Sequence, residues 1–166
     1  MKIFKTIVWI AILFILESVF VNIIDIRGAV PDLLTVFAAA YAARERRLTT
    51  SAYVIIVCGV LTGSIVGRSF PISVLEAAFA GTAMFVLKDR IRFVPVWLKN
   101  AAVMLVTAAA AGFAEYFAAC GFGDVFGALA GVLSYTAYTL AAALIIYPIV
   151  KRSVFYEKEG SKLLVI

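Results

Sequence analysis

Residues 6–24 read TIVWIAILFILESVFVNII, a run of 19 residues with one ionisable side chain, Glu17. As a helix, this run rises roughly 28 Å, close to the ~30 Å hydrocarbon core of a bilayer. The whole chain of 166 residues has the same character, with 64% apolar and 15% charged residues. Soluble domains carry roughly a quarter charged residues. The sequence therefore predicts a single integral membrane domain.

The first run has Lys2 and Lys5 before it, a pattern that signal peptides share. The residues that follow it, 25–27, read DIR, and no small-x-small cleavage site is present. We therefore expect a retained helix.

Five further apolar runs follow, which predicts an all-α bundle of six transmembrane helices. Two of the six, residues 30–43 and 74–87, have 14 residues each and would rise only roughly 21 Å, so they need extension, local thinning of the bilayer or shielding by neighbours. Residues 151–166 form a polar tail with an apolar end. The expected spans are about 6–24, 30–43, 51–66, 74–87, 96–119 and 125–150.

The basic residues alternate with the spans. If the N-terminus, the loops 44–50 and 88–99 and the tail share one side, that side holds 13 of the 15 Lys and Arg residues. The other side holds only Arg27 and Arg68. By the positive-inside rule, the basic side is cytoplasmic. An even number of spans then places both termini in the cytoplasm.

The composition also bears on chemistry. The chain has no histidine and two cysteines, Cys58 and Cys120, too few soft ligands for a zinc or iron–sulfur site. No nucleotide-binding loop, nucleophile elbow or paired intramembrane aspartate accompanies them. The net charge of +5 comes from basic residues that indicate which loops are cytoplasmic. It does not indicate nucleic-acid binding, since no nucleic-acid-binding motif accompanies it. We expect a non-catalytic protein without a cofactor.

Two series of glycines repeat every fourth residue. This spacing places them on one face of a helix, where two backbones can approach closely. The plain interpretation is contact between helices of the same bundle, and the alternative is a groove for the transmembrane helix of another protein. The series are Gly59, Gly63 and Gly67, and Gly123, Gly127 and Gly131.

Acidic residues inside membrane spans are candidates for function, because burying a charge is costly. Asp32 follows Pro31 at a helix start, where a carboxylate complements the positive helix end. Residues 73–76 have the pattern of a capping box, which assigns Glu76 to another helix start. Glu115 is expected near the outer interface. For these three acids, a structural role is the preferred interpretation.

Glu17 differs from the other acids because it lies near the middle of its span and has no cap to make. Two interpretations stay open. The side chain is either protonated and hydrogen-bonded, or it has a proton-linked role. In both, we expect it to face the bundle interior or a partner helix.

The second run begins with Gly28-Ala29-Val30-Pro31-Asp32-Leu33-Leu34, and the glycine-spaced third run and the turn at Pro71 follow it. This order, with the length and the six spans, resembles MreD, the small membrane subunit of the bacterial cell-elongation machinery. The likeness covers residues 1–151. The family often has glutamine where Glu17 stands, and an acidic residue where this chain reads Gly67-Arg68.

The resemblance implies a non-catalytic scaffold. Its expected partner is an MreC-like protein with one span, and it would act indirectly with the MreB cytoskeleton and with RodA and its class B transpeptidase. With these partners it would control lateral peptidoglycan synthesis and rod shape. Whether the chain also forms a homodimer is left open.

The MreD fold is similar to the substrate-binding S-components of energy-coupling-factor transporters, which supplies the alternative of a vitamin-binding subunit. Such a subunit needs a polar-lined pocket and an Ala-x-x-x-Ala surface for its coupling subunit. The first run of this chain has Ala11 and bulky aliphatic residues instead.

Overall fold

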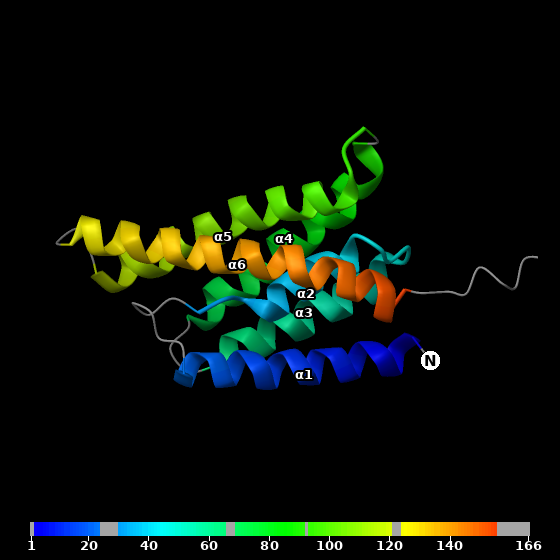
Figure 1. The fold of residues 1–166 in the computed structure, drawn as a ribbon, viewed down its shortest axis with the longest axis horizontal. Helices are drawn as coiled ribbons and strands as arrows, with labels where there is room; N and C mark the ends of the chain where they lie inside the picture. The colour runs from blue at the N-terminus through cyan, green and yellow to red at the C-terminus, as the bar shows by residue number, and fades with distance from the viewer. Residues whose placement is uncertain (1, 24–29, 66–68, 92, 121–123, 156–166) are drawn as a thin grey trace, which may run out of the picture.

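The computed structural model describes residues 2–23, 30–65, 69–91, 93–120 and 124–155 (Figure 1). Within these residues the chain is all-helical and forms one bundle. The helices are α1 (Lys2–Ile23), α2 (Leu33–Ala42), α3 (Leu48–Ser64), α4 (Phe70–Arg90), α5 (Val96–Cys120) and α6 (Val125–Ser153).

Four of the helices, α1, α4, α5 and α6, are long and apolar enough to cross a membrane. This confirms the expected all-helical membrane bundle. The other two, α2 and α3, are shorter apolar helices of 10 and 17 residues. With 10 residues, α2 rises roughly 15 Å, about half of the hydrocarbon core.

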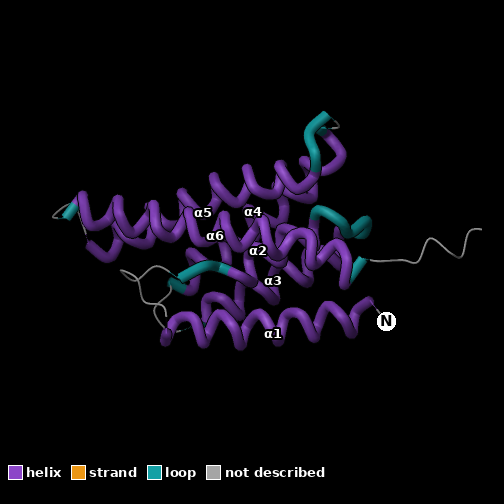
Figure 2. Tube along the Cα trace, in the orientation of Figure 1, coloured by secondary structure: helices purple, strands orange, loops and turns teal. Residues whose placement is uncertain are grey.

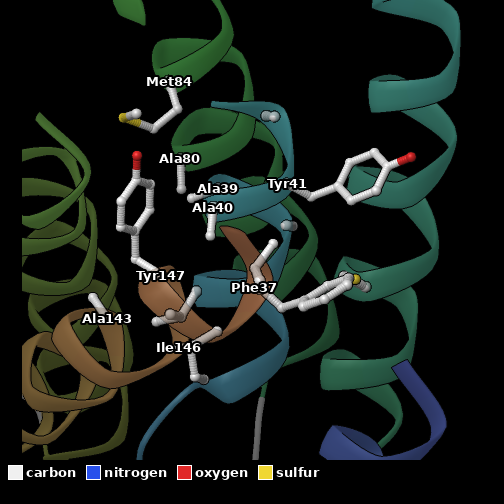
Figure 3. Close-up of a cluster of buried hydrophobic side chains, with 14 of the residues drawn as sticks. Phe37, Ala39, Ala40, Tyr41, Ala80, Met84, Ala143, Ile146 and Tyr147 are labelled. Atoms are coloured by element: carbon white, nitrogen blue, oxygen red, sulfur yellow. The ribbon is translucent and has the colours of Figure 1, made fainter. Parts of the chain in front are cut away.

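The short helix α2 lies in the middle of the bundle and contacts all five other helices (Figures 1 and 2). Every residue of α2 is buried. Its sequence, LLTVFAAAYA, is apolar on all faces, as a helix surrounded by protein requires. Bulky and small residues occupy different faces: Figure 3 shows Phe37 and Tyr41 pointing away from Tyr147, while Ala39 and Ala40 lie beside Ala80. The shortness of α2 is therefore compatible with a membrane, because the neighbouring helices shield its ends.

The fourth helix is longer than the sequence indicated. It begins at Phe70, three residues before the expected capping box, and it runs to Arg90. The prediction of a start at Ser73 is wrong, because Pro71 occupies the first turn, where a missing N–H costs nothing. Ser73 lies within that turn and donates its hydroxyl to the Ser69 carbonyl at 3.2 Å. With 21 residues, α4 is one of the four helices long enough to span.

The basic segments gather at one end of the bundle. Lys2 contacts Glu45 in the α2–α3 loop, and Lys88 at the end of α4 donates to the carbonyls of Ala42 and Glu45. Lys2 also lies 4.3 Å from the ring of Phe155, which follows α6. The N-terminus and the ends of α2, α4 and α6 thus share one end, as the alternation of charge predicted (Figure 1). We call it the basic end.

Candidate functional site

The N-terminus of α2 is held by a side chain from its own sequence. Asp32 is the N-cap residue and accepts a hydrogen bond from the Thr35 N–H at 2.8 Å. The same carboxylate oxygen accepts the Thr62 hydroxyl of α3 at 3.4 Å. Asp32 is completely buried, and Pro31 immediately before it is partly exposed. The expected role of Asp32 at a helix start is confirmed.

Glu17 of α1 caps the same helix from outside. One of its carboxylate oxygens accepts the N–H groups of Leu33 and Leu34, each at 3.1 Å. The expectation that Glu17 has no cap to make is therefore wrong, since it caps a neighbouring helix. Its side chain is completely buried and faces the bundle interior, as expected.

A fourth polar side chain completes the arrangement. The Asp32 N–H donates to the Thr139 hydroxyl of α6 at 3.4 Å, and Thr139 is completely buried. Glu17 of α1, the N-cap residue Asp32, Thr62 of α3 and Thr139 of α6 thus meet at the α2 N-terminus, and we call them the α2 N-terminal cluster. The positive end of a helix attracts carboxylates, and its first N–H groups need acceptors. The cluster meets both needs with side chains that are completely buried.

This cluster is suited to holding a helix in place. Its carboxylates and hydroxyls engage backbone N–H groups and one another. Within the described part of the chain, no group of three or more His, Cys, Asp or Glu residues is arranged to hold a metal ion.

We predict that Asp32→Ala lowers the stability of the detergent-solubilised protein by about 1–2 kcal/mol, the usual cost of a lost N-cap. Asp32→Asn keeps an oxygen that can accept the Thr35 N–H and should lose less. Thermal unfolding followed by circular dichroism measures both. Equal unfolding temperatures for the wild type and Asp32→Ala would contradict the capping role.

A second polar group lies at the basic end, around Glu45. Its carboxylate forms an ion pair with Lys2 at 2.5 Å and accepts the Tyr41 hydroxyl at 3.0 Å. The backbone N–H groups of Arg46 and Arg47 donate to its other oxygen at 2.8 and 3.1 Å. Burial by itself would raise the pKa of Glu45, but the hydrogen bonds from Lys2, Arg47 and Tyr41 and the Lys2 charge outweigh it and lower the pKa to about 2.

This low pKa predicts a pH dependence. A carboxyl whose pKa falls from 4.5 in the unfolded chain to about 2 in the folded one stabilises the fold fully above pH 4.5. That contribution is lost as the pH falls from 4.5 towards 2. Thermal unfolding measured across this interval should show the loss, and Glu45→Gln should have a smaller slope there. An identical slope in the variant would exclude Glu45 as its source.

The glycines of α3 face α4. A Cβ added at Gly59 would lie 3.1 Å from the Val74 Cα, and one at Gly63 would lie 3.1 Å from the Phe70 Cα. Both contacts are with backbone, so the two helices approach too closely for a side chain. The third glycine of this series, Gly67, lies outside the described residues.

The glycines of α6 have two different environments. A Cβ at Gly131 would overlap the Tyr116 ring of α5, whereas Gly127 is exposed and its N–H donates to the N-cap Asp124 at 2.9 Å. Gly123 lies outside the described residues. The described glycines of both series that are not exposed, namely Gly59, Gly63 and Gly131, therefore contact neighbouring helices of the same chain.

Glu76 of α4 has a partner that the sequence did not indicate. It accepts the Tyr135 hydroxyl of α6 at 2.8 Å, and both side chains are buried. The two residues are far apart in sequence, and no local pattern joins them. Glu115, on α5, is partly buried. Cys58 is a free, completely buried thiol on α3.

The outer surface is hollowed where α4 and α5 meet. A groove of ≈ 580 Å³ runs from Phe79 of α4 to Ile91, the residue after α4, and along α5 between Leu98 and Thr107. A second groove of ≈ 360 Å³ adjoins it and contains Ala110. Both are lined almost wholly by apolar side chains.

Comparison with known proteins adds no relative: no protein family, no curated protein and no solved structure matches this chain. The inference of function therefore rests on the residues and their arrangement.

Proposed function

We propose that this chain is a non-catalytic scaffold subunit of the bacterial cell-elongation complex. In this proposal it binds the single span of an MreC-like protein, and through it acts on lateral peptidoglycan synthesis and rod shape. The basic end faces the cytoplasm of the bacterial inner membrane. MreB and RodA with its class B transpeptidase are indirect partners.

The observation that carries the proposal is the environment of α2. The Pro31-Asp32-Leu33-Leu34 element, on which the resemblance to MreD rests, begins the helix at the centre of the bundle. Its buried acids cap that helix, with Glu17 and Asp32 accepting backbone N–H groups. The interior polar groups thus have a structural use. The surface that remains available for binding a partner is apolar and faces outward, as a helix-binding subunit requires.

The vitamin-binding alternative places a ligand in a polar-lined pocket. In this chain, α2 and its apolar side chains fill the centre of the bundle. The two grooves between α4 and α5 are apolar and open on the outside. These observations favour the scaffold.

Copurification tests the proposal. The chain, tagged at its C-terminus, is expressed with an MreC-like protein from the same genome, and an unrelated protein with one span serves as control. We expect a stable complex with the MreC-like protein only, and rounded cells when the chain is depleted. A purified chain that carries a stoichiometric vitamin and fails to bind the MreC-like protein would refute the scaffold role and support the alternative.

A further inference from the structure

The groove between α4 and α5 has two parts that differ in their ends. The larger part, which we call the proximal groove, extends from Phe79 on α4 to Ile91, the C-cap residue, and ends beside Lys99 of α5 at the basic end. The smaller part, the distal groove, continues from Phe79 towards Ile72 and Ala114 and has no basic residue in its lining. The two parts share Phe79, and both are open to the outside of the bundle.

The length of the proximal groove corresponds to one leaflet. Phe79 and Ile91 are twelve residues apart, which is roughly 18 Å along α4. Half of the hydrocarbon core is roughly 15 Å. An acyl chain that enters from the basic end would therefore fill this groove and stop near the middle of the bilayer. A spanning helix would have to occupy the distal groove as well.

The basic end of the proximal groove carries positive charge. Lys99 is a buried residue that lines the groove, and its ammonium donates to the carbonyls of Leu87 and Lys88 at 3.2 and 3.0 Å. An ammonium has three N–H donors, and these carbonyls take two of them. The last turn of α4 adds Lys88 and the exposed Arg90, against one acid, Asp89.

Lys88 and Lys99 at this end differ in their hydrogen-bond partners. Lys88 turns towards the α2–α3 loop, where it donates to the Ala42 and Glu45 carbonyls. Among the described residues, Lys99 is the cation that lines the groove end, and Arg90 is an exposed cation in the adjoining last turn of α4. Basic pockets between transmembrane helices on the cytoplasmic side bind the head groups of anionic lipids. Exposed aromatic residues at the same end, Phe93 and Trp97, are of the kind that lies at the membrane interface.

We propose that the proximal groove is a binding site for an anionic phospholipid. One acyl chain lies between α4 and α5, and the phosphate lies at the groove end beside Arg90 and Lys99. The complementary charge and the one-leaflet length select a lipid over a protein helix. This inference goes beyond the scaffold role and does not depend on it.

Two alanine positions offer a matched test. Ala102 lines the proximal groove and Ala110 the distal groove, and both are exposed on α5. Ala102→Phe fills the proposed site, whereas Ala110→Phe adds the same bulk outside it. Neither substitution enters the buried core, so both proteins should fold. Circular dichroism and gel filtration in detergent check this.

Delipidated protein is titrated with phosphatidylglycerol or with phosphatidylcholine of equal chain length, and bound lipid is counted by native mass spectrometry. We expect the wild type to prefer phosphatidylglycerol at least about fivefold, the effect of one basic residue near a lipid surface. Ala102→Phe should lose this binding and Ala110→Phe should keep it. Arg90→Gln should lower the preference, and Lys99→Gln should lower it where the protein remains folded.

Three results would overturn the proposal. The first is equal binding of the two lipids by the wild type, and the second is equal loss of binding in the two alanine variants. The third is that Ala102→Phe abolishes copurification with a protein partner, or self-association, while lipid binding stays unchanged. The groove would then be occupied by a protein. A failure of the scaffold role alone leaves the lipid measurements unaffected, so the two proposals are tested separately.

Discussion

Replacing Glu17 with leucine should destabilise the protein more than any other single change at the α2 N-terminus. Leucine cannot accept the Leu33 and Leu34 N–H groups, which then lie buried without this acceptor. Each buried donor without a partner costs about 1–3 kcal/mol. We therefore expect a loss of roughly 2–6 kcal/mol, with α1 loosened from α2.

Glu17→Gln is the informative control. Its amide oxygen can accept the same N–H groups without the charge, so we expect it to retain most of the stability. Leu16→Ala changes an exposed neighbour on α1 and should have little effect on the interior. Thermal unfolding in detergent ranks the three variants.

Labelling of Cys58 gives a local readout of the same change. The Cys58 thiol is completely buried, in the same core cluster as Leu33 and Leu34 at the start of α2. In a Cys120→Ala background, Glu17→Leu should speed the reaction of Cys58 with maleimide, while Glu17→Gln should not. Unchanged stability and unchanged labelling in Glu17→Leu would show that Glu17 does not hold α2.

The second large effect is expected at Gly59. Its added Cβ would meet the Val74 Cα and the Ala77 Cβ, both at 3.1 Å. A backbone atom cannot rotate away, so a larger side chain must push α3 and α4 apart. Gly59→Leu should reach the upper end of the roughly 1–3 kcal/mol that overpacking costs. Thermal unfolding measures this loss.

Val60→Leu provides the matched control for this variant. Val60 is the next residue on α3, and its side chain is 41% exposed on the outer face. The added methylene therefore meets no neighbouring helix, and the unfolding temperature should not change. If Gly59→Leu were as stable as Val60→Leu, the contact between α3 and α4 would not require glycine.

The sequence by itself determined the class of the protein and the arrangement of its ends. The chain has too few polar residues to form a water-facing surface around apolar runs as long as residues 6–24, so lipid must surround these runs. The alternation of basic loops predicted which segments share an end, and the contacts of Lys2 and Lys88 with the loop at Glu45 agree. The N-cap role of Asp32 was also local, since it needs only Thr35 three residues on.

Only the tertiary structure decided what the buried acids do. Glu17 and Leu33 are 16 residues apart, and Glu76 and Tyr135 are 59 apart, so no periodic pattern connects them. The start of α4 was predicted wrongly from the Ser73–Glu76 pattern, because Pro71 is also a helix-start signal and lies in the first turn. The same physical reason underlies each case. Local patterns report the preferences of a segment, whereas the acceptors and neighbours of a buried group come from other helices. The role of Glu17 therefore follows only from the position of α2, whose first N–H groups it accepts.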